Sequence, residues 1–195
     1  MIAIQTTARL IRKLPLDASG YLTASTIVPV PASPVSTGHC ALDGWRAEWL
    51  DECQAVLMIH EPTLLPLILP GRQRQDLPAL EWLFQTGLLD ILSEMGCQGV
   101  QFRQISDGFQ PLAFIRERWP RNSLMWGRLL LTAERQIRCQ QVTLQSSRFC
   151  LHHSLAMMEV MMQTGVLMMH PVQEFLRWLE EDSACLAAEP AAVYR

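Results

Sequence analysis

The sequence predicts an α/β protein of the α+β type, in which a small, largely antiparallel sheet packs on two long helices and a C-terminal helical extension follows. Two neighbouring segments with strand patterns, residues 45–50 and 54–60, predict the sheet. Residues 76–95 carry apolar side chains at three- and four-residue steps, which is the spacing of an amphipathic helix. We expect an α/β domain over residues 1–147 and, over residues 148–195, a helical extension of the same domain that ends in a frayed tail.

The first element is predicted to be a short strand followed by a short helix. Ile2 and Ile4 alternate with other residues, and the apolar positions then change to helical spacing until Pro15 ends the pattern. Residues 18–42 contain no charged residue and are rich in Pro, Ser, Thr and Gly. This segment is either a long loop or a strand around residues 26–30 with loops on both sides.

Two antiparallel strands joined by a tight turn are expected next. In residues 45–50, Trp45, Ala47 and Trp49 share one face and alternate with charged residues, as in a strand. Residues 54–60 form a continuous apolar run, which is typical of a central strand covered on both faces.

The helix over residues 76–95 has a start and a stop signal. Asp76 is a suitable N-cap, Pro78 is tolerated in the first turn, and Gly96 ends the helix. The apolar positions of this helix are Leu77, Leu80, Phe84, Leu88, Ile91 and Met95.

The remaining elements follow from the same patterns. Residues 100–105 alternate like a strand, and residues 111–115 predict another. Helices are then expected over residues 122–138, over residues 148–163, and from His170-Pro171 onward.

Composition limits the class of protein. The chain has 195 residues, of which 49% are hydrophobic and 18% are charged, and its net charge is −3. Its longest apolar stretches are shorter than the roughly 18–20 residues that a membrane-spanning helix needs, and the N-terminus shows no signal-peptide pattern. The six cysteines form no C-x-x-C pair. These features favour a cytoplasmic protein with reduced thiols that neither binds nor crosses a membrane.

Several short motifs occur in a familiar order. They are IQTTARLIRKL at residues 4–14, the Trp-led strand at 45–50, an apolar strand ending near Thr63-Leu64, the Pro70-Gly71 turn before a long helix, and RNSLMWG at residues 121–127. Over about residues 1–138 this order resembles a family of small bacterial proteins of unknown function, sometimes found with plasmid and mobile-element genes. The last motif is similar to that family's Asn-(Arg)-Ser-x-x-Gly stretch. The resemblance implies a fold but no activity, and the chain departs from it in residues 18–42 and in its Met-rich C-terminal region.

The C-terminal helices give the leading functional hypothesis, a non-enzymatic interaction domain that binds a protein partner or a second copy. Methionine is flexible and polarisable, and it is common on surfaces that accept several partners. The same spacing also suits an ordinary core helix. The residues predicted to bind the partner are Met157, Met158, Met161, Met162, Phe175 and Leu179.

An arginine stripe supports the alternative hypothesis, an accessory protein that binds nucleic acid or phosphate. Arg121, Arg128 and Arg135 are spaced by seven and Arg138 follows three later, so all four share one side of the predicted helix. Asn122 and Ser123 at the start of this helix could bind an anion through exposed amides, or could serve only as an N-cap.

Candidates for catalysis and metal binding are weaker. His60-Glu61 follows an apolar strand and could act as a general base with its orienting group, which gives a third hypothesis of a small hydrolase. Cys150, His152 and His153 lie close together, but no second pair with ligand spacing accompanies them, so we expect no metal site. No phosphate loop, dinucleotide fingerprint or nucleophile elbow is present, and we expect neither a cofactor nor catalysis.

Overall fold

A computed structural model describes residues 1–23, 42–71, 76–97, 99–116, 124–139, 148–165 and 169–188. The strands are β1 (Ile2–Thr6), β2 (Trp45–Leu50), β3 (Ala55–His60), β4 (Leu65–Pro70) and β5 (Leu112–Arg116). The helices are α1 (Ala8–Ile11), α2 (Leu80–Glu94), α3 (Val100–Asp107), α4 (Leu124–Cys139), α5 (Phe149–Gln163) and α6 (Pro171–Ala188). The strand considered around residues 26–30 lies outside the described residues.

The five strands form one mixed sheet in the order β4-β3-β2-β1-β5. The predicted α/β class is confirmed. The expectation of a largely antiparallel sheet is correct for β2, β3 and β4, which pair antiparallel, whereas β1 pairs parallel with both β2 and β5. The connections allow this, because a parallel pair needs a crossover of a dozen or more residues. Residues 7–44 separate β1 from β2, and residues 7–111 separate β1 from β5.

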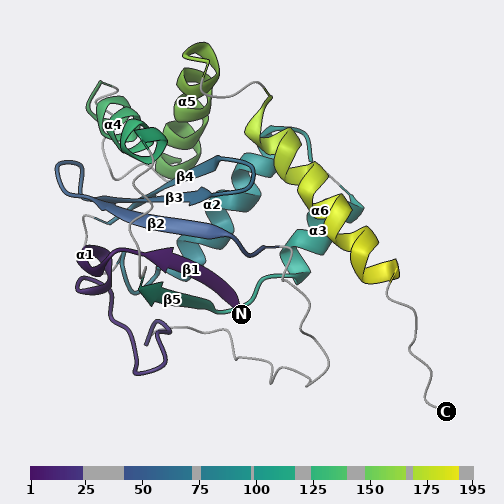
Figure 1. The fold of residues 1–195 in the computed structure, drawn as a ribbon, viewed down its shortest axis with the longest axis horizontal. Helices are drawn as coiled ribbons and strands as arrows, with labels where there is room; N and C mark the ends of the chain where they lie inside the picture. The colour runs from purple at the N-terminus through teal and green to yellow at the C-terminus, as the bar shows by residue number, and fades with distance from the viewer. Residues whose placement is uncertain are drawn as a thin grey trace.

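Helices cover both faces of the sheet (Figure 1). Trp45 and Met58 point into a core that also contains apolar residues of α1, α2 and α6. Leu57 and Ile59 point into a second core with residues of α4 and α5. α5 contributes to both, because Met158 packs into the first core and Met157 into the second. No helix in the described part of the chain has the length and apolarity needed to cross a bilayer.

Residues 100–107 form helix α3 and not the strand predicted over 100–105. The alternating apolar positions also fit a helix, because Phe102 and Ile105 are three residues apart and Phe109 is four further on. All three pack against the first core. Gly99 precedes the helix with a φ of +72°, a conformation that separates α3 from α2. Over so short a segment the apolar spacing fits both a strand and a helix, and the packing against the first core decides for the helix.

The helix predicted from Asp76 begins later, at Leu80. Residues 76–79 form turns, and the N-cap position is Ala79, without a side-chain cap. The remaining predicted helices were placed within a few residues of α4, α5 and α6.

The edge strand β4 is closed to further pairing. In the register with β3, the backbone N–H and C=O groups of residues 66, 68 and 70 point away from the sheet. Two of these residues are prolines, which have no N–H to offer, and the N–H of Ile68 donates to the Ser154 Oγ of α5 at 2.9 Å. β4 therefore presents no free N–H along its outer side, which protects an edge against pairing with another chain.

The opposite edge, β5, is closed by side-chain and backbone acceptors. The N–H of Leu112 donates to the buried carboxylate of Glu81 in α2 at 2.8 Å. The N–H of Phe114 donates to the carbonyl of Gly20 at 2.9 Å. Gly20 has a φ of +87°, and a Cβ atom there would lie 2.9 Å from the Phe114 carbonyl oxygen, so glycine is required for this approach.

A pocket between helices α2 and α5 as the candidate functional site

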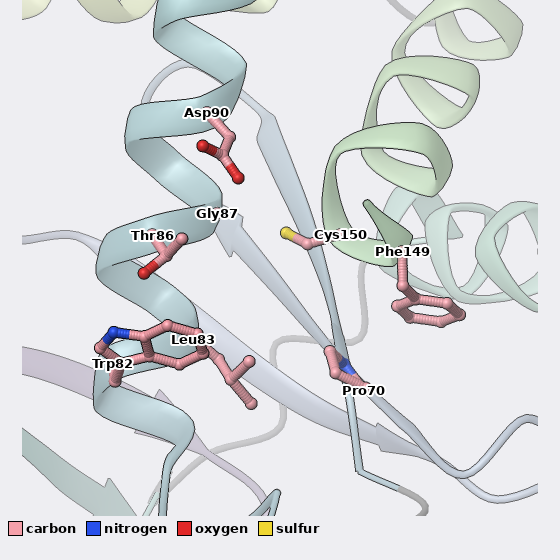
Figure 2. Close-up of a pocket in the computed structure, with 8 residues that line it drawn as sticks. All are labelled: Pro70, Trp82, Leu83, Thr86, Gly87, Asp90, Phe149 and Cys150. Carbon is pink, nitrogen blue, oxygen red and sulfur yellow. The ribbon is translucent and has the colours of Figure 1, made fainter. Parts of the chain in front are cut away.

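The described residues line an open pocket of about 160 Å³ between α2 and α5, at the β4 edge of the sheet. Figure 2 shows Trp82, Thr86 and Asp90 along α2, with Cys150 of α5 facing them across the gap. The lining residues are Pro70, Trp82, Leu83, Thr86, Gly87, Asp90, Phe149 and Cys150. The walls are mainly apolar, and the Asp90 carboxylate is the charged group among the lining residues described.

The two helices approach closely at Gly87 and Cys150. A Cβ atom at position 87 would collide with the Cys150 Sγ. Glycine in a helix interior costs about 1 kcal/mol relative to alanine. Here it lets α5 lie against α2, and both residues of this contact line the pocket.

The thiol of Cys150 stays protonated. Burial raises its pKa to about 12, and the nearby Asp90 carboxylate acts in the same direction. The thiolate is the nucleophilic and metal-binding form of cysteine. Cys150 is therefore an apolar wall of the pocket and not a reactive group.

Trp82 is the most exposed aromatic side chain at the pocket, with 63% of its surface accessible. Its indole occupies the rim, next to Leu83 (Figure 2). Large aromatic side chains bury much area at low entropic cost, and tryptophan is enriched among the residues that dominate binding energy. The rim thus offers an apolar contact surface beside an apolar hollow.

The residues predicted to bind a partner are divided between the two cores. Met157, Met158, Met161 and Phe175 are buried within the chain. Met162 is 39% exposed, and Leu179 is partly buried against the first core. The structure does not bring these six residues together on one face, and only Met162 and Leu179 are accessible to a partner of the folded chain.

His60 lies inside an aromatic cluster and has no free ring nitrogen. Its Nε2 lies 2.9 Å from the Asp43 carbonyl, which can only accept, so Nε2 carries the proton and Nδ1 accepts from the Thr63 hydroxyl at 2.8 Å. Burial lowers the pKa of His60 to about 4. Glu61 lies on the other side of the strand, 3.7 Å from the buried Arg46. His60 and Glu61 are therefore not arranged as a base with its orienting carboxylate.

The arginine stripe is partly used within the chain. Arg138 forms an ion pair with Glu52, whereas Arg128 and Arg135 are exposed and have no ion pair among the described residues. Leu131 lies between them on α4 and is 66% exposed. Arg121, Asn122 and Ser123 lie outside the described residues.

The structure does not bring Cys150, His152 and His153 together as a set of metal ligands. Cys150 faces α2, while His153 is fully buried against Phe149, with ring centroids 4.4 Å apart. His152 is exposed. Within the described ranges no three His, Cys, Asp or Glu side chains are grouped so that they could hold a metal ion.

Sequence reasoning missed Trp82, Gly87 and Asp90 as a set. The signals were a large aromatic and a glycine off the apolar stripe of residues 76–95. These residues form a pocket only because α5 packs beside α2. Helix α5 begins more than fifty residues further along the chain, and local periodicity does not predict which helices pack together.

Comparisons with known proteins gave one result. Neither the curated proteins nor the solved structures include a match to this chain. A family model described as a domain of unknown function (DUF6933) matches residues 3–118. This region spans β1 to β5 and includes the α2 wall of the pocket, but not α5. Because the match covers more than half of the chain, the protein belongs to the DUF6933 family.

Proposed function

We propose that this chain is a non-enzymatic interaction domain that receives an apolar side chain of a protein partner in the pocket between α2 and α5. The observation that carries the proposal is the apolar cavity of about 160 Å³ with the 63% exposed Trp82 on its rim. Burial of apolar surface contributes about 25 cal/mol of binding free energy per Å². A partner side chain that enters the pocket and also contacts the Trp82 indole would bury apolar surface on both.

The chemistry of the pocket favours binding over catalysis. The Cys150 thiol, with a pKa of about 12, is not a nucleophile at neutral pH. His60, which the sequence offered as a general base, is held in the core by two hydrogen bonds. The pocket walls supply shape and apolar surface, which are the features of a recognition site.

The closed sheet edges favour recognition by side chains over recognition by strand addition. A partner strand needs free backbone groups along an edge. The outward N–H groups of β4 are absent at its prolines or bonded to Ser154, and those of Leu112 and Phe114 on β5 are bonded to Glu81 and Gly20. The helical layer is therefore the surface that remains for a partner.

N-acetyl-leucinamide, a minimal apolar side chain with capped termini, tests the proposal. We expect heteronuclear NMR to show a saturable shift of the Trp82 indole resonance, with a roughly millimolar dissociation constant appropriate to a ligand of this size. Gly87 and Asp90 amide resonances should shift with it. The midpoint temperature of thermal unfolding should rise with probe concentration, because a ligand that binds only the folded state stabilises it by mass action.

Two variants provide the comparison. Trp82→Ala removes the rim and should weaken probe binding several-fold. Met95→Ala truncates another exposed apolar residue just beyond the opposite end of α2, and should leave binding unchanged. Shifts that do not saturate, or that are equal in both variants, would contradict the proposal.

A further inference from the structure

The exposed face of α4 carries an apolar side chain between two positively charged side chains. Leu131 is 66% exposed, and Arg128 and Arg135 are three residues before and four residues after it. These spacings place all three side chains within one side of the helix. An apolar tip flanked by two guanidinium groups is the chemical complement of an apolar pocket with a carboxylate.

The charges on both surfaces have no ion-pair partner among the residues that the structure describes. Neither Arg128 nor Arg135 has an ion pair or a side-chain hydrogen bond among the described residues, in contrast to Arg138, which pairs with Glu52. Asp90 is exposed at the pocket and has no salt bridge or hydrogen bond in the described part of the chain. Each surface therefore has charge available for a second molecule.

The pocket has the volume that a leucine side chain needs. An engineered apolar cavity of about 150 Å³ in another protein binds benzene, a molecule similar in size to the leucine side chain. The cavity between α2 and α5 is of comparable volume, about 160 Å³. Leu131 can therefore fill it from outside without displacing core residues.

Resting on the proposed function, we infer that the occupant of the pocket is Leu131 of a second copy of this chain. Arg128 and Arg135 of that copy lie against Asp90. In a two-fold dimer the contact is reciprocal, with α4 of each copy at the pocket of the other. Both α4 and α2 pack against α5, so the two surfaces lie on elements that share this helix. The arginine stripe and the pocket are then two halves of one interface.

A contact of this size gives a weak dimer that depends on salt. One buried leucine with a few exposed ion pairs belongs to the smallest class of protein interfaces. Exposed ion pairs contribute at most about 1 kcal/mol each and are screened at high ionic strength. The dimer should dissociate on dilution and as salt rises.

Analytical ultracentrifugation of the full chain, from about 10 µM to about 1 mM protein, tests the inference over the range expected for weak self-association. We expect the wild type to pass from monomer to dimer. Asp90→Lys alone and Arg128→Glu with Arg135→Glu should each remain monomeric. Mixing these two variants should restore a dimer, because the intact α4 of the first fits the intact pocket of the second. Arg12→Glu, which changes an exposed arginine just after α1, serves as the matched control and should dimerise like the wild type.

The outcomes separate this inference from the proposed function. A wild type that stays monomeric at the highest concentration while N-acetyl-leucinamide still binds overturns the second copy as occupant and leaves the pocket as a binding site. If neither occurs, both proposals fail. If the wild type dimerises but the mixture of the two variants stays monomeric, the dimer interface lies elsewhere on the molecule. Saturable binding of single-stranded DNA by a monomeric wild type, lost in the double arginine variant, would assign the stripe to nucleic acid instead.

Discussion

At the scale of single residues, two buried histidines have opposite environments. His60 has both ring nitrogens bonded, to Thr63 and to the Asp43 carbonyl, and its ring packs against Trp45 and Phe175. It joins the β3–β4 turn, the segment before β2 and helix α6. His153 is equally buried, but neither of its ring nitrogens has a hydrogen-bond partner. An unpaired buried polar group costs about 1–3 kcal/mol, so His153 destabilises the fold while His60 holds it together.

Both histidines make stability depend on pH. Burial lowers the pKa of each to about 4, from an ordinary value of 6.5. Between these values the unfolded chain binds protons that the folded chain does not bind. The free energy of unfolding is therefore greatest above pH 6.5 and falls as the pH is lowered toward 4, by up to about 1.4 kcal/mol per pH unit for each histidine.

His153→Leu should raise the free energy of unfolding by about 1–3 kcal/mol at pH 7, because it removes the unpaired polar group and keeps an apolar side chain in the core. It should also reduce the loss of stability between pH 6.5 and 5, since one of the two contributions is gone. Urea unfolding at several pH values measures both effects. A variant that is less stable than the wild type, with the same pH slope, would show that His153 has a partner that stabilises it.

At the scale of elements, the contact between α2 and α5 depends on one glycine. Gly87→Ala would place a methyl group where the Cys150 Sγ lies. We expect destabilisation on the order of 1–3 kcal/mol, despite the gain in helix propensity of about 1 kcal/mol, because either the buried Cys150 thiol or the two helices must move. Gly127→Ala in α4 is the matched control, since a Cβ atom there has no neighbour within 4 Å, and it should stabilise the protein by about 1 kcal/mol.

Chemical denaturation of Gly87→Ala, of Cys150→Ala and of the variant that carries both changes measures this contact. Removal of the sulfur makes room for the new methyl group, so the double variant should be more stable than the sum of the single effects predicts. Additive effects would mean that α2 and α5 are not in contact at this point.

The same scale shows which elements could be predicted from the sequence. The strand around Trp45, the apolar run that became β3 and the helices near residues 80, 124, 149 and 171 follow from local periodicity. β4 did not, because Pro66 and Pro70 argue against a strand unless it lies at an edge, and edge position is a property of the whole sheet. α3 was misassigned because alternation over six residues also fits a helix that begins after a glycine.

At the scale of the whole molecule, the candidate site arises from segments that are distant in sequence. The α2 wall lies within the DUF6933 match and the α5 wall outside it, so the pocket forms only when the C-terminal helices pack on the β4 edge. Cys150 of α5 lines the pocket, and Ser154, four residues later on the same helix, accepts the hydrogen bond from the β4 edge. Helix α5 therefore both closes the sheet edge and completes the pocket. The sequence predicts an interaction role for this region through its methionines, of which the fold buries Met157, Met158 and Met161.

Filling the pocket tests the central claim most directly. Thr86→Phe places a ring in the cavity from the α2 wall, whereas Gln85→Phe adds the same ring one residue earlier, outside the lining. Both variants should fold, as judged by circular dichroism and thermal unfolding. In NMR titrations with N-acetyl-leucinamide, we expect binding to be abolished by Thr86→Phe and retained by Gln85→Phe. Undiminished binding to a folded Thr86→Phe variant would contradict the assignment of this pocket as the binding site.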